Sequence, residues 1–197
     1  MREGGKRSRS RGRDDDNSAQ ARAGTGRVSR RFGGEYTFKV DAKGRVSIPA
    51  RFRRLIEADD PDFTDGLRPQ FTLVYGPKSQ NHLKGYTIKE LQKLQAKVAR
   101  LPNSPLKRRL IDENFAKSHD AEIDPDGRLV LPAWLRERVG LSGEAMIVGT
   151  MDTFEIWEPA TYEASRTTED EDLGFELPEG IDPMDALDLV LAQRGDT

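Results

Sequence analysis

The chain contains no cysteine, only two histidines and no long apolar segment. The absence of cysteine excludes disulfide bonds, thiolate metal sites, iron–sulfur clusters and cysteine nucleophiles, and it is typical of a reducing cytoplasm. His82 and His119 alone offer little to metal centres or catalytic triads. No stretch approaches the roughly 18 apolar residues of a membrane span, and the N-terminus lacks the apolar segment of a secretory signal. We therefore predict a cytoplasmic protein without metal, cofactor, small-molecule substrate or membrane attachment.

Charge is distributed unevenly along the 197 residues, although the net charge is only −2. Residues 1–34 carry ten basic and four acidic side chains, which gives +6. Residues 158–197 carry twelve acidic and two basic side chains, which gives −10, and residues 35–157 are nearly neutral at +2. A basic head and an acidic tail around a near-neutral body indicate a polyelectrolyte partner or electrostatic self-regulation.

Both ends of the chain have the composition of segments without a packed core. Residues 1–34 are rich in Arg, Gly, Ser and Asp, which predicts a disordered basic extension, either solvated or acting as an auxiliary nucleic-acid arm. Residues 163–197 form an acidic C-terminal tail. An apolar pattern at helical spacing over residues 182–191 leaves two alternatives open for this tail, a helix that docks on a partner and a disordered solubilising segment.

The body between these ends combines strand and helix patterns and predicts an α+β fold. Residues 35–88 contain four strand patterns and one short helix. Residues 89–117 contain two helices, for which Thr87 and Ser104 are the expected N-caps. Residues 118–162 return to strand, turn, strand, short helix and two further strands.

The turn of the first segment recurs in the last one. Residues 41–53 and 124–136 are identical at six of thirteen positions, namely Asp, Gly, Arg, Pro, Ala and Arg. The order of strands, turns and helix around the two copies is also shared. We therefore predict a duplicated unit of about 45 residues, two copies of which pack together because one alone is too small to fold.

Residues 41–49, Asp-Ala-Lys-Gly-Arg-Val-Ser-Ile-Pro, resemble the turn of AbrB-type swapped-hairpin DNA-binding domains. Two such copies in one chain, with the two helices between them, resemble the MraZ family over about residues 35–162. The resemblance implies tandem swapped-hairpin units packed as a pseudo-dimer. It also implies a ring-shaped homo-oligomer in the cytoplasm and nucleoid. Such a protein regulates transcription without catalysis, by binding tandem short G-rich promoter boxes of the division and cell-wall gene cluster.

Four basic residues in the first copy are candidates for contacting double-stranded DNA. Lys43 and Arg45 flank a glycine on a protruding turn, and an arginine on such a tip can bond bidentately to guanine O6 and N7. Arg51 and Arg54 share one side of the following helix and could reach phosphates. The plainer interpretation is a solvated hairpin and helix whose charges maintain solubility.

The residues that recur between the copies are secondary candidates, either for DNA contact or for a structural role, and we favour the structural role for the two aspartates and for the helix arginines. Arg53 and Arg136 are expected to bond within the fold. Asp41 and Asp124 are expected to form the turns by bonding backbone N–H groups or fixing the nearby arginine. Arg128, the counterpart of Arg45, is a secondary candidate for DNA contact.

The two turns also differ in charge. Residues 41–45 carry a net charge of +1, whereas residues 124–128 carry −1 because Asp126 replaces Lys43. A carboxylate beside Arg128 repels phosphate and competes for its guanidinium. We therefore expect the first copy to read DNA and the second mainly to build the fold and the oligomer.

A different class of function stays open as an alternative. AbrB-like dimers also occur in antitoxins, where a C-terminal tail wraps a toxin, and residues 163–197 fit that description. Two hairpin units with a helical spacer exceed what an antitoxin generally needs. An enzyme is the poorest interpretation, because the sequence has no phosphate loop, nucleophile elbow or metal-spaced cluster.

Overall fold

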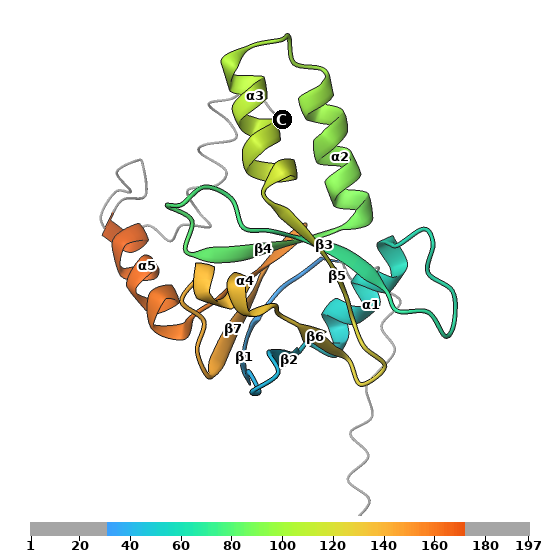
Figure 1. Ribbon diagram of the computed structural model, residues 1–197, viewed down its shortest axis with the longest axis vertical. Coiled ribbons are helices and arrows are strands. Elements are labelled where there is room, and N and C mark those ends of the chain that lie inside the picture. Colours follow the sequence, from blue (N-terminus) through green and yellow to red (C-terminus); the bar gives the residue numbers. More distant parts are fainter. Residues whose placement is uncertain (1–30, 172–197) are drawn as a thin grey trace, which may run out of the picture.

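The computed structural model describes residues 31–171. Its strands form a six-stranded antiparallel sheet and a separate two-stranded ribbon (Figure 1). The strands are β1 Glu35–Lys39, β2 Arg45–Ser47, β3 Gln70–Val74, β4 His82–Thr87, β5 Ser118–Glu122, β6 Arg128–Val130, β7 Glu144–Thr150 and β8 Thr153–Trp157. The helices are α1 Ala50–Asp59, α2 Ile88–Ala99, α3 Pro105–Ile111, the π-helical segment η1 Asp112–Ala116, α4 Ala133–Arg138 and α5 Pro159–Glu171.

Strands of the two sequence copies are interleaved in the large sheet, where β1 of the first copy is followed by β7 and β8 of the second, β4 and β3 of the first, and β5 of the second. The edge strand β1 of the first copy pairs with β7 of the second, and the edge strand β5 of the second pairs with β3 of the first. The central pair, β4 and β8, joins the copies again. If each strand is replaced by its counterpart in the other copy, the same strand order is obtained, read in the opposite direction. Neither copy has all three of its strands side by side, because two strands of the other copy lie between them.

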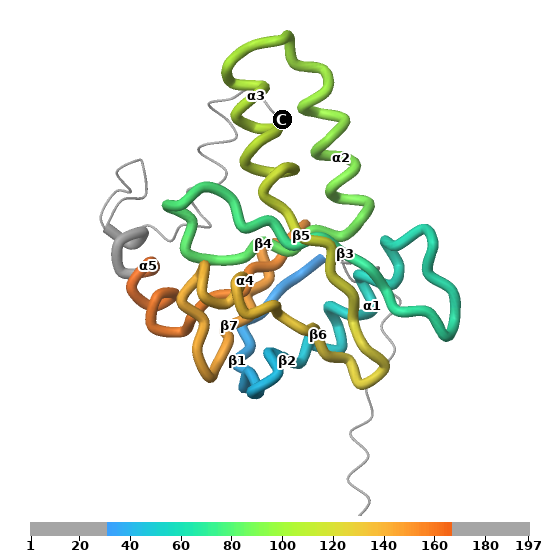
Figure 2. The backbone as a smooth tube through the Cα atoms, viewed as in Figure 1, coloured from blue at the N-terminus to red at the C-terminus, as the bar shows by residue number. Residues whose placement is uncertain are grey.

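The two-stranded ribbon also takes one strand from each copy. β2 pairs antiparallel with β6, and Val46 lies opposite Leu129. These two residues occupy equivalent positions of the duplicated turn segments, 83 residues apart. The ribbon and both turns lie at one end of the molecule, and the α2–α3 hairpin projects from the other (Figure 2).

The core is centred on aromatic rings contributed by distant segments. Phe52 of α1 and Phe154 of β8 are both fully buried, with ring centroids 5.7 Å apart. Phe71 of β3 packs on Phe154 at 5.6 Å, and Phe32 packs edge-on against Phe52 at 4.9 Å. Burial of such rings contributes to the apolar stabilisation that holds the two copies together.

The ordered fold begins before the expected boundary at Glu35. Phe32 was expected to lie in the disordered extension of residues 1–34, but it is only 5% exposed and exchanges backbone hydrogen bonds with Met151. A lone aromatic residue in a polar segment gives no periodic signal, and its partner lies more than a hundred residues away. The rest of that extension, residues 1–30, lies outside the described residues.

At the other end, α5 continues through the expected start of the acidic tail at residue 163. Its Tyr162 hydroxyl donates to Glu35 of β1 at 2.7 Å, and Arg166 pairs with the same carboxylate at 2.9 Å. These contacts fasten the first turns of α5 to the edge of the sheet. The apolar pattern over residues 182–191 lies outside the described residues.

The connecting helices begin where the sequence predicted. The Thr87 side chain accepts a hydrogen bond from the backbone N–H of Glu90, and that of Ser104 accepts one from Lys107, each at 3.2 Å. Both N-cap predictions are confirmed. Val98 is the buried residue of α2, whereas α3 buries none of its residues fully. The hairpin therefore leaves apolar surface exposed.

Candidate functional site

The first turn is held by the carboxylate of Asp41. Its Oδ1 accepts hydrogen bonds from the backbone N–H groups of Lys43 and Arg45, both at 2.9 Å. Its Oδ2 pairs with Nε of Arg45 at 2.6 Å. The backbone N–H of Arg45, together with its guanidinium and the N–H of Lys43, lowers the pKa of Asp41 below its usual value. The turn thus presents Lys43 and Arg45 from a fixed backbone.

The second turn reproduces this geometry. Asp124 Oδ1 accepts the backbone N–H of Arg128 at 2.8 Å, and Oδ2 pairs with Arg128 Nε at 3.1 Å. Burial by itself raises the pKa of Asp124, but hydrogen bonds from the backbone and guanidinium of Arg128 outweigh it and lower that pKa. Gly44 and Gly127 both adopt positive φ, +79° and +77°, as each turn requires.

The two turn arginines differ in how much of the guanidinium is engaged. Arg45 pairs through Nε with Asp41, and its terminal nitrogens form no hydrogen bond with another of residues 31–171. Arg128 pairs through Nε with Asp124 and through a terminal nitrogen with Asp126. The hydrogen bond from Arg128 to the Asp124 side chain, together with the negative charges of Asp124 and Asp126, raises the pKa of Arg128. The expected competition of Asp126 for Arg128 is confirmed. Of the two turns, the first has the arginine with more capacity to bond an outside acceptor.

Each turn is also anchored by the other copy. The backbone N–H of Leu131 donates to the carbonyl of Gly44 at 2.8 Å, and the N–H of Ile48 donates to the carbonyl of Gly127 at 3.0 Å. Both accepting carbonyls belong to the peptide group that directly precedes a turn arginine. The position of each arginine backbone is therefore fixed from the opposite copy.

Arg53 and Arg136 lie within the fold and cross between the copies. Arg136 Nε donates to the carbonyl of Leu131 at 3.1 Å and lies 3.0 Å from where a Cβ on Gly44 would stand. The guanidinium of Arg53 covers Gly127 in the same way. The duplication thus pairs the helix arginine of one copy with the turn glycine of the other. Sequence reasoning missed this crossing, because identical spacing within each copy suggests contacts inside the copy.

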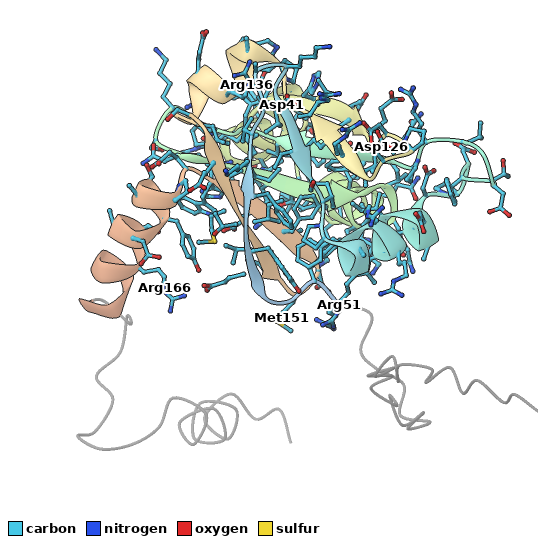
Figure 3. All side chains as sticks on the ribbon, turned by 90° about the horizontal axis from the view of Figure 1, so that it is seen from below. Asp41, Arg51, Asp126, Arg136, Met151 and Arg166 are labelled. Carbon is cyan, nitrogen blue, oxygen red and sulfur yellow. The ribbon has the colours of Figure 1, made fainter. Side chains whose placement is uncertain are left out.

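The structure does not bring the four DNA-contact candidates into one cluster. Lys43 and Arg45 share the first turn, whereas Arg51 at the start of α1 donates to the backbone carbonyl of Arg31 at 3.2 Å. Figure 3 shows Arg51 well separated from Asp41 and Arg136. Arg54 is exposed on α1. Contacts of Arg51 and Arg54 with phosphate therefore stay a prediction.

An exposed aromatic group in the second copy escaped sequence reasoning. Trp134 of α4 is 47% exposed and meets Tyr75 and His119 edge-on, with centroids 5.3 and 5.8 Å away. His82 instead stacks on Trp157 at 4.1 Å. Among residues 31–171, no group of three or more His, Asp or Glu side chains has metal-binding geometry. None of the helices in that range has the length and apolar content needed to cross a bilayer.

Interlocked copies, each presenting an Asp-x-x-Gly-Arg turn on a shared ribbon, define a class of tandem-repeat α+β proteins. Comparison with known proteins identifies the family within that class. The model of the family described as "MraZ protein, putative antitoxin-like" matches residues 31–114 and again residues 115–176. The chain belongs to the MraZ family. The resemblance noted in the sequence is confirmed, and so is the repeat.

Individual relatives match over most of their length. The transcriptional regulator MraZ of Ruegeria sp. (strain TM1040) is 44% identical over 162 residues, which is 82% of this chain and 97% of the relative. That of Cereibacter sphaeroides (strain ATCC 17029 / ATH 2.4.9) is 43% identical over 165 residues, 80% of this chain and 95% of the relative. The more distant one of Coxiella burnetii (strain Dugway 5J108-111) is 34% identical over 152 residues, 77% and 93%.

Proposed function

We propose that this chain is a sequence-specific DNA-binding transcriptional regulator whose first turn reads base edges. The observation that carries the proposal is the bonding of Arg45. Asp41 fixes its backbone and Nε, which leaves the terminal nitrogens for the O6 and N7 acceptors of a guanine in the major groove. Because the side chain is already oriented, little conformational freedom is lost on binding. The names of the relatives support this class of function.

Lys43 has a complementary role in this proposal. Its side chain is exposed beside Arg45, so that it meets a phosphate or a second guanine when the turn enters the groove. Arg51 and Arg54 supply phosphate contacts farther along the DNA. These contacts position the protein without reading sequence.

We further infer that the two copies act as a pseudo-dimer of swapped hairpins. The ribbon shared between β2 and β6 and the palindromic strand order support this arrangement. Several chains assemble into a closed homo-oligomer in the cytoplasm, on the nucleoid. It binds tandem short G-rich boxes in the promoter of the division and cell-wall gene cluster. Each subunit then engages one box, and the linked contacts give an avidity that a single turn lacks.

A selection for DNA sequences bound by the purified full-length protein tests this proposal. The expected result is a set of short G-containing boxes at regular spacing, bound less tightly as salt rises. Random recovered sequences with no enriched box would contradict it. The alternative favoured by the antitoxin-like description of the family predicts instead a stable complex with a toxin encoded next to this protein. Co-expression and co-purification of that neighbour tests the alternative separately.

A further inference from the structure

We propose that Arg136 of the second copy is a positioning residue for the DNA-reading turn of the first copy. This inference rests on the proposed function of Arg45, and it adds to that function a residue 91 positions away in the sequence. Arg136 approaches Gly44 of the first turn, although the two residues lie in different copies.

The geometry around Gly44 carries the argument. Gly44 is buried at φ +79°, and the space that a side chain would fill is occupied by the Leu131 carbonyl and the Arg136 guanidinium. The Arg136 Nε bonds that same carbonyl at 3.1 Å, while the Leu131 N–H bonds the Gly44 carbonyl at 2.8 Å. Arg136 thus holds Leu131, the residue directly after β6 to which the first turn is hydrogen-bonded.

This attachment acts directly on Arg45. The Gly44 carbonyl belongs to the peptide group that leads into Arg45, so its orientation sets the direction in which the Arg45 side chain leaves the backbone. A bidentate contact with guanine needs two hydrogen bonds of correct length and angle at once. A small rotation of that peptide group weakens base reading, whereas phosphate contacts tolerate it because they depend mainly on charge.

The counterpart contact in the second turn lacks the hydrogen bond found in the first. Arg53 covers Gly127, but its buried Nε has no hydrogen-bond partner among the described residues, whereas Arg136 Nε bonds Leu131. Among residues 31–171, the arginine that covers the turn glycine therefore forms a side-chain hydrogen bond at the first turn and not at the second. The asymmetry coincides with the turn whose arginine has free bonding capacity. It also supplies a matched control, since Arg53 and Arg136 occupy equivalent positions.

The test compares five variants of the full-length protein: Arg136→Ala, Arg136→Lys, Arg53→Ala, Arg45→Ala and Arg100→Ala. Arg100 is exposed at the end of α2 and controls for loss of one positive charge. Each variant is titrated against the selected operator and against unrelated duplex DNA. Thermal unfolding reports stability, and hydrogen–deuterium exchange of the peptide spanning residues 41–47 reports order in the turn.

We expect Arg136→Ala to lose about 5- to 100-fold in operator affinity, the range of a lost guanine contact. Its affinity for unrelated DNA should stay within about twofold of the Arg100→Ala variant, and exchange in residues 41–47 should accelerate. Arg136→Lys, which keeps a donor for Leu131, should recover part of the loss. Arg53→Ala should leave the operator affinity nearly unchanged.

The outcomes separate the inference from the proposed function. If Arg45→Ala binds the operator as well as the unmodified protein, the proposed site is wrong and the inference falls with it. If Arg45→Ala loses affinity but Arg136→Ala does not, only the inference is overturned. Equal losses for operator and unrelated DNA, or equal losses for Arg53→Ala and Arg136→Ala, also overturn it. Should Arg136→Ala not fold, the comparison of Arg136→Lys with Arg53→Ala decides.

Discussion

Val46 of β2 lies directly opposite Leu129 of β6, and each residue is only 1% exposed. The two positions are equivalent in the duplicated sequence, so the ribbon pairs a residue with its own counterpart. Each copy contributes one strand and one buried side chain at this point. A change in one copy therefore acts on the turn of the other.

The two turn arginines should differ in their effect on DNA binding. Arg45→Ala is expected to cost about 1–3 kcal/mol in operator affinity, the usual value of a bidentate guanine contact. Arg128→Ala should cost clearly less, because Asp124 and Asp126 already engage that guanidinium. Titration of both variants against the selected operator measures the difference. Equal losses would mean that both turns touch DNA, and a larger loss for Arg128→Ala would reverse the assignment.

The turn glycines should differ in their effect on stability. A Cβ at Gly44 meets the carbonyl oxygen of Leu131, a backbone atom held in the ribbon, whereas a Cβ at Gly127 meets the guanidinium of Arg53, which can swing away. Gly44→Ala is therefore expected to reduce the free energy of unfolding by roughly 2–4 kcal/mol and Gly127→Ala by roughly 1–2 kcal/mol. Denaturant unfolding provides the measurement.

Gly140→Ala is the control for this comparison. Gly140 has a similar φ of +68°, but a Cβ there would have no neighbour within 4 Å. Its loss of stability thus measures backbone strain alone, about 1–2 kcal/mol. If Gly44→Ala is no more destabilising than Gly140→Ala, the close approach to Leu131 contributes nothing and the crossed packing is wrong.

Stability should fall in acid because of the turn aspartates. Hydrogen bonds from Arg45 lower the pKa of Asp41, and hydrogen bonds from Arg128, acting against burial, lower that of Asp124. A carboxyl whose folded pKa lies below its usual value of 3.8 stabilises the fold above that value, and the contribution disappears as the pH falls through the lower folded pKa. We expect a nearly constant melting temperature from about pH 7 to pH 5 and a decrease below about pH 4.

The variant Asp41→Asn identifies the source of that decrease. It should be less stable than the unmodified protein at neutral pH and should lose less between pH 5 and pH 3. Asp65→Asn, at an exposed loop position, should follow the unmodified protein throughout. Parallel pH curves for Asp41→Asn and the unmodified protein would show that the first turn makes no contribution to acid sensitivity.

Local features of this fold were predictable from the sequence, and contacts between the copies were not. Thr87 and Ser104 cap their helices as expected, because a cap depends on only a few neighbouring residues. The crossing of Arg136 onto Gly44 is invisible in one sequence, since spacing reports contacts along the chain but not the exchange of strands between equivalent units. Phe32, which packs on α1 and β8, was missed because a lone aromatic residue in a polar segment gives no periodic signal.

The candidate site was predictable in part. The Asp-x-x-Gly-Arg pattern identified both turns and the competition of Asp126 for Arg128. Arg51 was grouped with the first turn because it follows closely in sequence, yet the start of α1 directs it to the Arg31 carbonyl. Helix direction depends on how Phe52 packs into the core, which periodicity alone does not determine.

The acidic tail should weaken non-specific DNA binding. Residues 172–197 carry seven acidic side chains and one basic side chain, and a truncation after Glu171 leaves α5 intact. The truncated protein is expected to bind unrelated duplex DNA more tightly at low salt, with the difference shrinking as salt screens the charges. Filter binding across a salt series gives the comparison. Identical curves for both proteins would leave the tail as a solubiliser or a partner site.

The apolar surface of the α2–α3 hairpin should hold subunits together. Leu106 is 60% exposed and Ile111 44% exposed on α3, and Ile111 lines a groove between the helices with Val98 and Phe115. Surfaces of this kind are characteristic of association sites. Light scattering of the purified protein should give a mass several times 22.1 kDa, and Ile111→Glu should reduce it, because a buried unpaired carboxylate costs several kcal/mol.

The matched control for assembly is Lys97→Glu, which introduces the same carboxylate at an exposed position of α2. It should leave the mass unchanged, so that a loss of assembly in Ile111→Glu reflects burial rather than charge. The dissociated Ile111→Glu variant should still show a thermal unfolding transition. It should lose operator affinity, because the avidity across tandem boxes disappears. A monomeric unmodified protein at micromolar concentration would contradict both the assembly and the avidity argument. An unchanged mass for Ile111→Glu would move the subunit interface to another surface, with the exposed Trp134 the next position to substitute.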